Sequence, residues 1–375
     1  MHLSIVSPPP AVLPASATRW LSHALATTLA AEVHATCHDC ALAPPAGAAY
    51  TPGGPFFHPV HKCCTFVPTL PNYAVGEALA AGGEGARRIE ARIARGGGVS
   101  PLALDRTELE ALIAREGRAG FGQAAALRCP YLTDAGACAV WASRNAVCAT
   151  WFCRHTQGAR GEGLWRSVKM YLSVAERAVA MHCALALDLD GEALAAHLHV
   201  GARAETLEAH DLDGTLDPAR AKATWGRWYG REGEFFRACA GVAARVDGPQ
   251  LDAIGGATLA AHAKALRARM ASATATTLPA RTRLGVVRVH GLRDGVATIE
   301  GYSVYDLLDV PAAVLDVLPY FDDARVDEAR ARCLAERGID VDDSFILRLL
   351  DHAMLIAEDD GDARAASASS SDPPG

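Results

Sequence analysis

The sequence has no apolar run that approaches the roughly 20 residues needed for a membrane-spanning helix. It also lacks an excess of basic residues, because 36 Lys and Arg stand against 43 Asp and Glu and give a formal net charge of -7. Binding to nucleic acid needs a concentrated basic face that neutralises phosphates. We therefore expect neither a membrane nor a nucleic acid as a partner.

The first residues lack the features of a secretory signal. They have no basic start, and Pro8, Pro9 and Pro10 interrupt the apolar run. Without export the cysteines lie in a reducing compartment, where disulfides are rare and clustered thiols more often bind metal or do chemistry. A cytoplasmic protein is the resulting expectation.

Length and composition allow several domains, because 375 residues that are 50% hydrophobic can bury two or three cores. The predicted fold class is mainly α with a small α+β C-terminal domain, preceded by a cysteine-rich metal-binding N-terminal domain. We expect the cysteine-cluster domain over 1–160, a helical region over 161–275, the small α+β domain over 280–356 and a disordered tail over 357–375.

Helical periodicity is clearest in the middle of the chain. Apolar residues recur at helical spacing from Leu164 to about Leu187 and predict one long amphipathic helix. A pattern over 75–94 is interrupted by glycines, and a further helix is expected over 105–116. Shorter helices are expected to follow, up to about Ala273.

The positions of the eleven cysteines are more informative than their number. Three are single residues in apolar helical patterns, where a thiol acts as a small buried hydrophobe: Cys183, Cys239 and Cys333. The other eight cluster in the N-terminal half and are the candidate metal ligands: Cys37, Cys40, Cys63, Cys64, Cys129, Cys138, Cys148 and Cys153.

The spacing of these eight suits thiolate ligation. Cys37-x-x-Cys40 lets two thiolates converge on one ion. Side chains of adjacent Cys63 and Cys64 diverge unless the backbone turns sharply, so such a pair tends to serve two sites. Eight thiolates thus fit two four-ligand sites, or one four-cysteine cluster with a further site. Zinc and iron–sulfur both accept four thiolates, and the absence of zinc-finger spacing favours a 4Fe-4S cluster.

The segment from Cys129-Pro-Tyr-Leu through Cys138-Ala-Val-Trp and Arg144-Asn to Cys148 and Cys153 resembles the YkgJ-type cysteine-cluster proteins. In that family the arginine is usually followed by proline, where this chain has Asn145. The family also compresses its opening cysteines, whereas here 22 residues separate Cys40 from Cys63. The resemblance implies a bound zinc or iron centre and does not imply a reaction.

A related group, the flagellin lysine N-methylases, has a similar cysteine rhythm, and this distant similarity makes methyl transfer to protein lysines an alternative. A redox dithiol at Cys37 and Cys40 is disfavoured, because a loop rich in Ala, Pro and Gly follows it. The glycines at 96–98 lack the Gly-Lys-Ser/Thr ending of a phosphate loop. The phosphatase-like string at 211–215 follows a polar helical segment rather than a buried strand, so we interpret it as a turn.

Histidines and cations near the cysteines are secondary candidates. Four histidines could supply a nitrogen ligand, although a surface or supporting role is the expected one: His38, His58, His61 and His155. Three cations could offset thiolate charge, although a solvated charge is the commoner interpretation: Lys62, Arg144 and Arg154.

The C-terminal region combines strands with helices. Strands are expected over 284–290 and 295–300 around an Arg-Asp-Gly turn, with helical patterns that begin near Val310, Val326 and Asp343. This order weakly resembles a PqqD-like winged helix, which implies that a peptide or protein substrate pairs with an exposed strand.

The sequence therefore predicts a metal-binding protein that holds an iron–sulfur cluster or zinc through the eight cysteines, in a redox or structural role. A protein- or peptide-modifying enzyme and an adaptor with a structural metal site are the alternatives, and whether the chain is an enzyme stays open.

Overall fold

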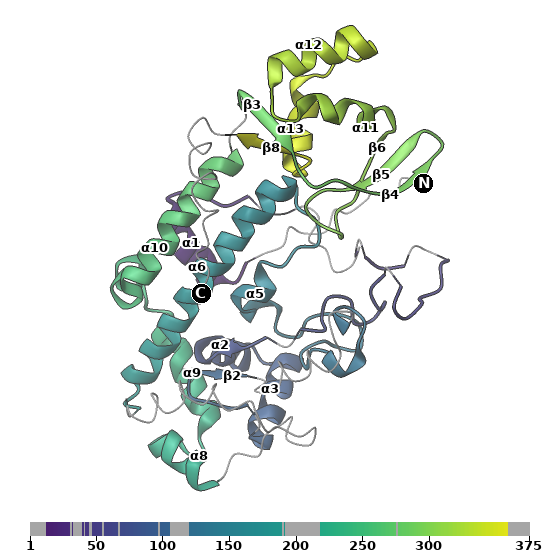
Figure 1. Cartoon of the computed structure of the whole chain (residues 1–375). Coiled ribbons are helices and arrows are strands. Elements are labelled where there is room, and N and C mark those ends of the chain that lie inside the picture. Colours follow the sequence, from purple (N-terminus) through teal and green to yellow (C-terminus); the bar gives the residue numbers. More distant parts are fainter. Residues whose placement is uncertain are drawn as a thin grey trace, which may run out of the picture. The chain divides into compact units, whose positions relative to one another are not determined.

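The computed structural model describes residues 13–30, 32, 40, 42–44, 47–54, 56–66, 68–96, 98–105, 120–189, 191, 218–274 and 277–358. Within these ranges the chain is mainly helical with small antiparallel sheets, as predicted (Figure 1). It forms two compact units, Met1–Phe152 with Trp165–Arg267 and Cys153–Leu164 with Ala268–Gly375. No helix in the described ranges is long and apolar enough to cross a membrane.

Some predictions fall where the structure describes nothing. The helix expected over 105–116, the 211–215 turn and the tail from 359 onward lie outside the described residues, apart from Asp105 itself. The domain boundaries expected from the sequence stay predictions.

The first unit is built from helices and short turns. Its helices are α1 (Ala15–Leu25), α2 (Asn72–Ala81), α3 (Gly83–Arg95), α5 (Ala146–Ala149), α8 (Pro218–Trp225) and α9 (Glu232–Ala243). Its 3-10 helices are η2 (Ala125–Leu127), η3 (Trp141–Ser143) and η7 (Gly226–Trp228), and strand β1 (Leu70–Pro71) pairs antiparallel with β2 (Ala103–Leu104). Helices α6 (Gly158–Ala186) and α10 (Gly248–Thr274) contribute residues to both units, and α10 is interrupted at Gly256.

Helix α2 packs directly on α9 in the first unit (Figure 1). Tyr73 of α2 and Phe235 and Phe236 of α9 are fully buried. A Cβ atom at Gly76 would lie 1.9 Å from the carbonyl oxygen of Phe236, so only glycine allows this close approach. The glycine break predicted within 75–94 is confirmed, because α2 ends at Ala81 and α3 begins at Gly83.

The long amphipathic helix is also confirmed as α6. Its apolar stripe includes Val168, Leu172 and Val179, which are fully buried. Cys183 on the same helix and Cys239 on α9 are buried too, and the Cys183 thiol donates to the carbonyl oxygen of Cys239 at 3.4 Å. Both cysteines are core residues, as predicted.

The second unit contains two three-stranded antiparallel sheets with the orders β7-β3-β8 and β4-β5-β6. The strands are β3 (Arg281–Leu284), β4 (Arg288–Arg293), β5 (Val296–Glu300), β6 (Leu308–Pro311), β7 (Ala324–Arg325) and β8 (Leu355–Glu358). The helices are α11 (Ala313–Val317), η8 (Leu318–Phe321), α12 (Val326–Arg337) and α13 (Asp343–Asp351).

The predicted hairpin exists as β4 and β5, joined by Asp294 and Gly295 at φ 51° and 76°. Two positive φ angles in succession are typical of the tight turn that an Asp-Gly pair favours. The strand expected over 284–290 is confirmed only in part, because Leu284 ends β3 and β4 starts only at Arg288. The helix expected near Val310 exists as α11, but it begins three residues later, at Ala313. Leu308 and Val310 alternate with exposed neighbours in strand β6, and α11 begins afterwards.

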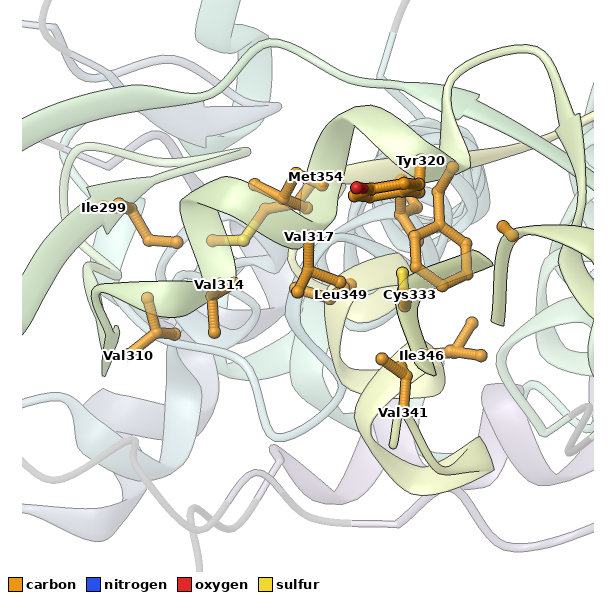
Figure 2. Packing of buried hydrophobic residues seen from close by; sticks show 14 of the residues in the cluster. Ile299, Val310, Val314, Val317, Tyr320, Cys333, Val341, Ile346, Leu349 and Met354 are labelled. Atoms are coloured by element: carbon orange, nitrogen blue, oxygen red, sulfur yellow. The ribbon is translucent and has the colours of Figure 1, made fainter. Parts of the chain in front are cut away.

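Buried apolar side chains from β5, β6, α11, α12 and α13 meet in the core of the second unit (Figure 2). Ile299, Ile346, Leu349 and Met354 are fully buried there. Cys333 of α12 lies in the same core, as predicted for an isolated cysteine.

Candidate metal centre

The segment that contains Cys63 and Cys64 forms a sharp turn rather than an extended strand. The amide of Lys62 donates to the carbonyl of His58 at 2.8 Å, and the amide of Cys64 donates to that of His61 at 2.9 Å. Lys62 itself has a left-handed φ of 48°. The carbonyl of Cys64 accepts the amide of Cys129 at 2.8 Å, so two distant cysteine segments are joined at their backbones.

A second turn reverses the chain between Cys129 and Cys138. The amide of Leu132 donates to the carbonyl of Cys129 at 3.1 Å, and Leu132 forms an antiparallel bridge with Cys138. The amide of Ala139 donates to the carbonyl of Tyr131 at 2.9 Å. Cys138 therefore returns alongside the segment that begins at Cys129.

Helix α5 contains Cys148, and Asn145 is the N-cap residue directly before the helix. The side-chain oxygen of Asn145 accepts the amide of Cys148 at 3.0 Å, as an N-cap residue does. Its side-chain nitrogen donates to the carbonyl of Thr69 at 3.2 Å. Asn145 thus caps the helix and ties it to a neighbouring segment.

The thiols of this region influence one another's charge. Burial is the main cause that raises the pKa of Cys129 to about 12, and the charges of Cys64 and Cys138 raise it further. The pKa of Cys148 is raised well above its usual range by burial and then by Cys129, Cys138 and Cys64. Four thiols from three segments are therefore close enough to oppose one another's ionisation.

Cys64 differs from the other three. A hydrogen bond with the Cys63 side chain lowers the pKa of Cys64 to about 7; burial opposes this, and the charges of Lys62 and Arg144 add to it. Its thiolate form, which is the form that binds metal, is accessible near neutral pH.

Arg144 is buried, contrary to the solvated charge that we expected for this residue. Its side chain is only 9% exposed. The guanidinium lies over the ring of Trp141, 3.3 Å from the ring centre, and Nε donates to the Trp141 carbonyl at 3.0 Å. Its positive charge acts on both Cys64 and Cys148.

The remaining predicted ligands differ from one another, and of these the Cys63 side chain is hydrogen-bonded to Cys64. Cys40 is half-buried, and its carbonyl accepts the amide of Ala43 at 3.0 Å. Cys153 belongs to the second unit, where its charge acts on Tyr305. Cys37 lies outside the described residues. None of the described cysteines forms a disulfide.

The histidines take different positions. His58 and His61 stack with ring centres 4.1 Å apart and an interplanar angle of 16°. Burial, and then the charges of His58 and Arg128, lower the pKa of His61. His155 lies in the second unit, where its Nδ1 is 3.4 Å from the hydroxyl of Tyr302. His38 is outside the described ranges.

The donor set suits a soft metal ion in its chemistry, because thiols from three segments lie near a buried cation and an imidazole of lowered pKa. The side chains as they lie do not complete such a site. In the ranges that the structure describes, no three or more Cys, His, Asp or Glu side chains are arranged so that they could hold one metal ion.

No protein-family model matches the chain, and no curated protein or solved structure does either. The resemblance to the YkgJ-type proteins, the distant similarity to flagellin lysine N-methylases and the likeness to a PqqD-like winged helix stay predictions from the motifs.

Two residues of this region have roles that the sequence did not reveal. Asn145 carries a helix cap, and its place three residues before Cys148 fits the spacing of a capping side chain. Arg144 stacks on Trp141 three residues earlier, a separation that a single turn can close. Both three-residue spacings are visible in the sequence, but only the backbone geometry of these turns shows that the side chains make these contacts.

Proposed function

We propose that the first unit holds zinc or an iron–sulfur cluster through its gathered cysteines, in a redox or structural role. The central thiolates are Cys64, Cys129, Cys138 and Cys148. The observation that carries the proposal is the backbone hydrogen bond from Cys129 to Cys64, which fixes two cysteine turns side by side.

Electrostatics support this assignment. Buried thiols that raise one another's pKa are costly to ionise together in the absence of a cation, and a bound metal ion reverses this effect. The motif resemblance favours the same chemistry, and a reducing compartment such as the cytoplasm would keep the thiols available. Cys37, Cys40, Cys63 and Cys153 stay candidates for further ligands of the same or a second site.

The test uses the full chain, purified without oxygen, reduced and stripped of metal, with cobalt(II) as the probe. Thiolate ligands give an intense ultraviolet charge-transfer band when they bind cobalt. We expect this band in the wild type and at least a tenfold weaker cobalt affinity in Cys129→Ala and Cys148→Ala, since each removes a ligand.

The matched control is Cys333→Ala, which removes a fully buried thiol from the core of the second unit. This variant should bind cobalt as the wild type does. A wild type without the band, or Cys129→Ala and Cys148→Ala with unchanged affinity, would contradict the proposal.

A second candidate function, peptide recognition, is favoured by strand β4. In the described part of the chain β4 pairs with β5 alone, and all six of its residues are exposed. Val289 and Leu292 lie opposite Ile299 and Ala297, which are fully buried. Paired residues share a face of the sheet, so Val289 and Leu292 extend the core face, yet they are 51% and 65% exposed.

An added strand would cover these two side chains, and we propose an extended peptide or protein segment with alternating apolar residues as the partner. Peptides selected from a randomised display library on the full chain provide the probe. Binding should weaken at least tenfold in Leu292→Asp and stay unchanged in Val304→Asp, an exposed apolar residue outside β4. Equal binding by both variants would contradict this role for the strand.

A further inference from the structure

Strand β4 carries its apolar and its basic side chains on opposite faces. Val289 and Leu292 pair with buried residues of β5 and lie on the core face of the sheet. Arg288, Gly291 and Arg293 pair with the β5 residues that alternate with those buried ones. Because successive side chains of a strand point to opposite faces, these three residues lie on the outer face.

His290 adds a third basic side chain to the outer face. The pairing register shifts at this residue, which makes it the extra residue of a β-bulge. Its Nε2 lies 2.7 Å from one carboxylate oxygen of Glu300, and the guanidinium of Arg288 donates to the other oxygen at 3.1 Å. Arg293 has no ion pair with any residue that the structure describes. The single carboxylate of Glu300 therefore does not offset all the basic groups of β4.

Gly291 leaves open space between these basic side chains. A Cβ atom at this position would have no heavy atom within 4 Å, and the residue does not have a positive φ. Neither close packing nor backbone conformation therefore requires a glycine here. A residue of an added strand opposite Gly291 would lie on the outer face, with Arg288 and Arg293 as diagonal neighbours that a long side chain can reach.

The outer face is most basic at the edge where a strand would be added. Neighbouring strands lie about 4.8 Å apart, so the basic residues of β4 would be one strand spacing from the partner. The acidic residues of this face are further away, since Glu300 lies on β5 and Asp309 on β6. Pairing with β4 of a second copy would bring basic residues together, and like charges that face one another are destabilising. A segment with an acidic residue is the complementary partner.

We propose that β4 selects an extended segment in which one acidic residue stands between two apolar residues. The acidic side chain lies over Gly291, and the two apolar side chains cover Val289 and Leu292. Strand β5 already places an apolar, a polar and an apolar residue against the same three positions. This inference rests on the second proposed function, peptide recognition, and adds the charge that the recognised segment carries.

The experiment measures the dissociation constants of the full chain with three synthetic peptides. The peptides share one extended sequence and differ only in the residue between two valines, which is Glu, Gln or Lys. The Glu peptide should bind about tenfold or more tightly than the Lys peptide, with the Gln peptide between them, because favourable cross-strand pairs are replaced by repulsive ones. The difference should shrink as the salt concentration rises.

Two variants with the same change in net charge show where the preference arises. Arg293→Glu replaces an exposed cation of the outer face and should remove the preference for the Glu peptide over the Lys peptide. The matched control is Arg283→Glu, at an exposed residue of β3 in the other sheet of the second unit, and it should keep the preference.

The specificity and the peptide recognition fail in different ways. Equal binding of the Glu and Lys peptides by the wild type, or a preference that persists in Arg293→Glu, overturns the acidic specificity and leaves peptide recognition intact. A wild type that binds none of the peptides contradicts peptide recognition itself. A dimer of the wild type in analytical ultracentrifugation that Leu292→Asp dissociates assigns the edge of β4 to a second copy and also overturns the inference.

Discussion

In the second unit the core is formed by apolar side chains on strands and helices, whereas around Cys64 and Cys129 the chain runs through reverse turns and short helices. The first arrangement is stabilised by burial of apolar surface. The second buries an arginine and thiols with raised pKa values. If the proposed metal centre exists, the cysteine region depends on a bound ion, whereas the core of the second unit depends on apolar packing alone.

Metal removal should produce the largest difference in stability between the cysteine region and the second unit. If the cysteine turns are completed by an ion, its loss should destabilise the first unit by at least about 5 kcal/mol, which is within the range of structural metal sites. Hydrogen exchange read by mass spectrometry should then rise in 58–65 and 128–150 and stay unchanged in β5 and α13. An equal rise of hydrogen exchange in all of these segments would contradict the difference between the two regions.

Truncation of a core side chain in the second unit should destabilise that unit and leave the cysteine region unchanged. Phe321 is fully buried in the second unit, so Phe321→Ala should lower the free energy of unfolding of that unit by about 3–5 kcal/mol. Cobalt binding by the cysteines should not change. Val286→Ala, at a residue that is 67% exposed, is the control and should stay within about 0.5 kcal/mol of the wild type.

The cap of α5 offers a smaller and more local test. Asn145→Ala removes the acceptor for the Cys148 amide and should cost about 1 kcal/mol in chemical denaturation. Asn145→Asp keeps the acceptor and should retain most of that stability. Equal losses in the two variants would mean that the bond to Thr69, and not the cap, holds the segment.

A pH effect is expected from Glu176 on α6. Burial raises the pKa of its carboxyl to about 8, although the amide of Ala146 donates to it and acts in the opposite direction. The folded state therefore holds a proton that the unfolded state releases, so this group's contribution to stability falls as the pH rises from about 4.5 to 8. Glu176→Gln should flatten that slope in urea denaturation between pH 5 and pH 8. An unchanged slope would show that Glu176 does not titrate in this window.

The sequence predicted features that are determined by residues close together along the chain. Asp294-Gly295 marked a hairpin because the pair accepts two positive φ angles, and the apolar period from Leu164 marked α6. It misassigned Val310, because two apolar residues at alternate positions do not distinguish a short strand from the start of a helix. It also missed β3 and β8, whose pairing joins segments far apart in the chain.

The candidate site was predictable in its donors but not in their grouping. Cysteine spacing predicted candidate thiol ligands, yet it did not show that Cys64, Cys129, Cys138 and Cys148 influence one another while Cys153 belongs to the second unit. That grouping depends on the hydrogen bond between the Cys129 amide and the Cys64 carbonyl, a long-range contact that residue spacing does not encode.

The central claim is tested most directly by the metal content of the full chain purified without oxygen, measured as iron, acid-labile sulfide and zinc together with the visible spectrum. We predict either about four irons with sulfide and a broad absorption near 400 nm, or one to two zincs without colour. A chain that carries neither metal and whose clustered cysteines all react as free thiols would contradict the account.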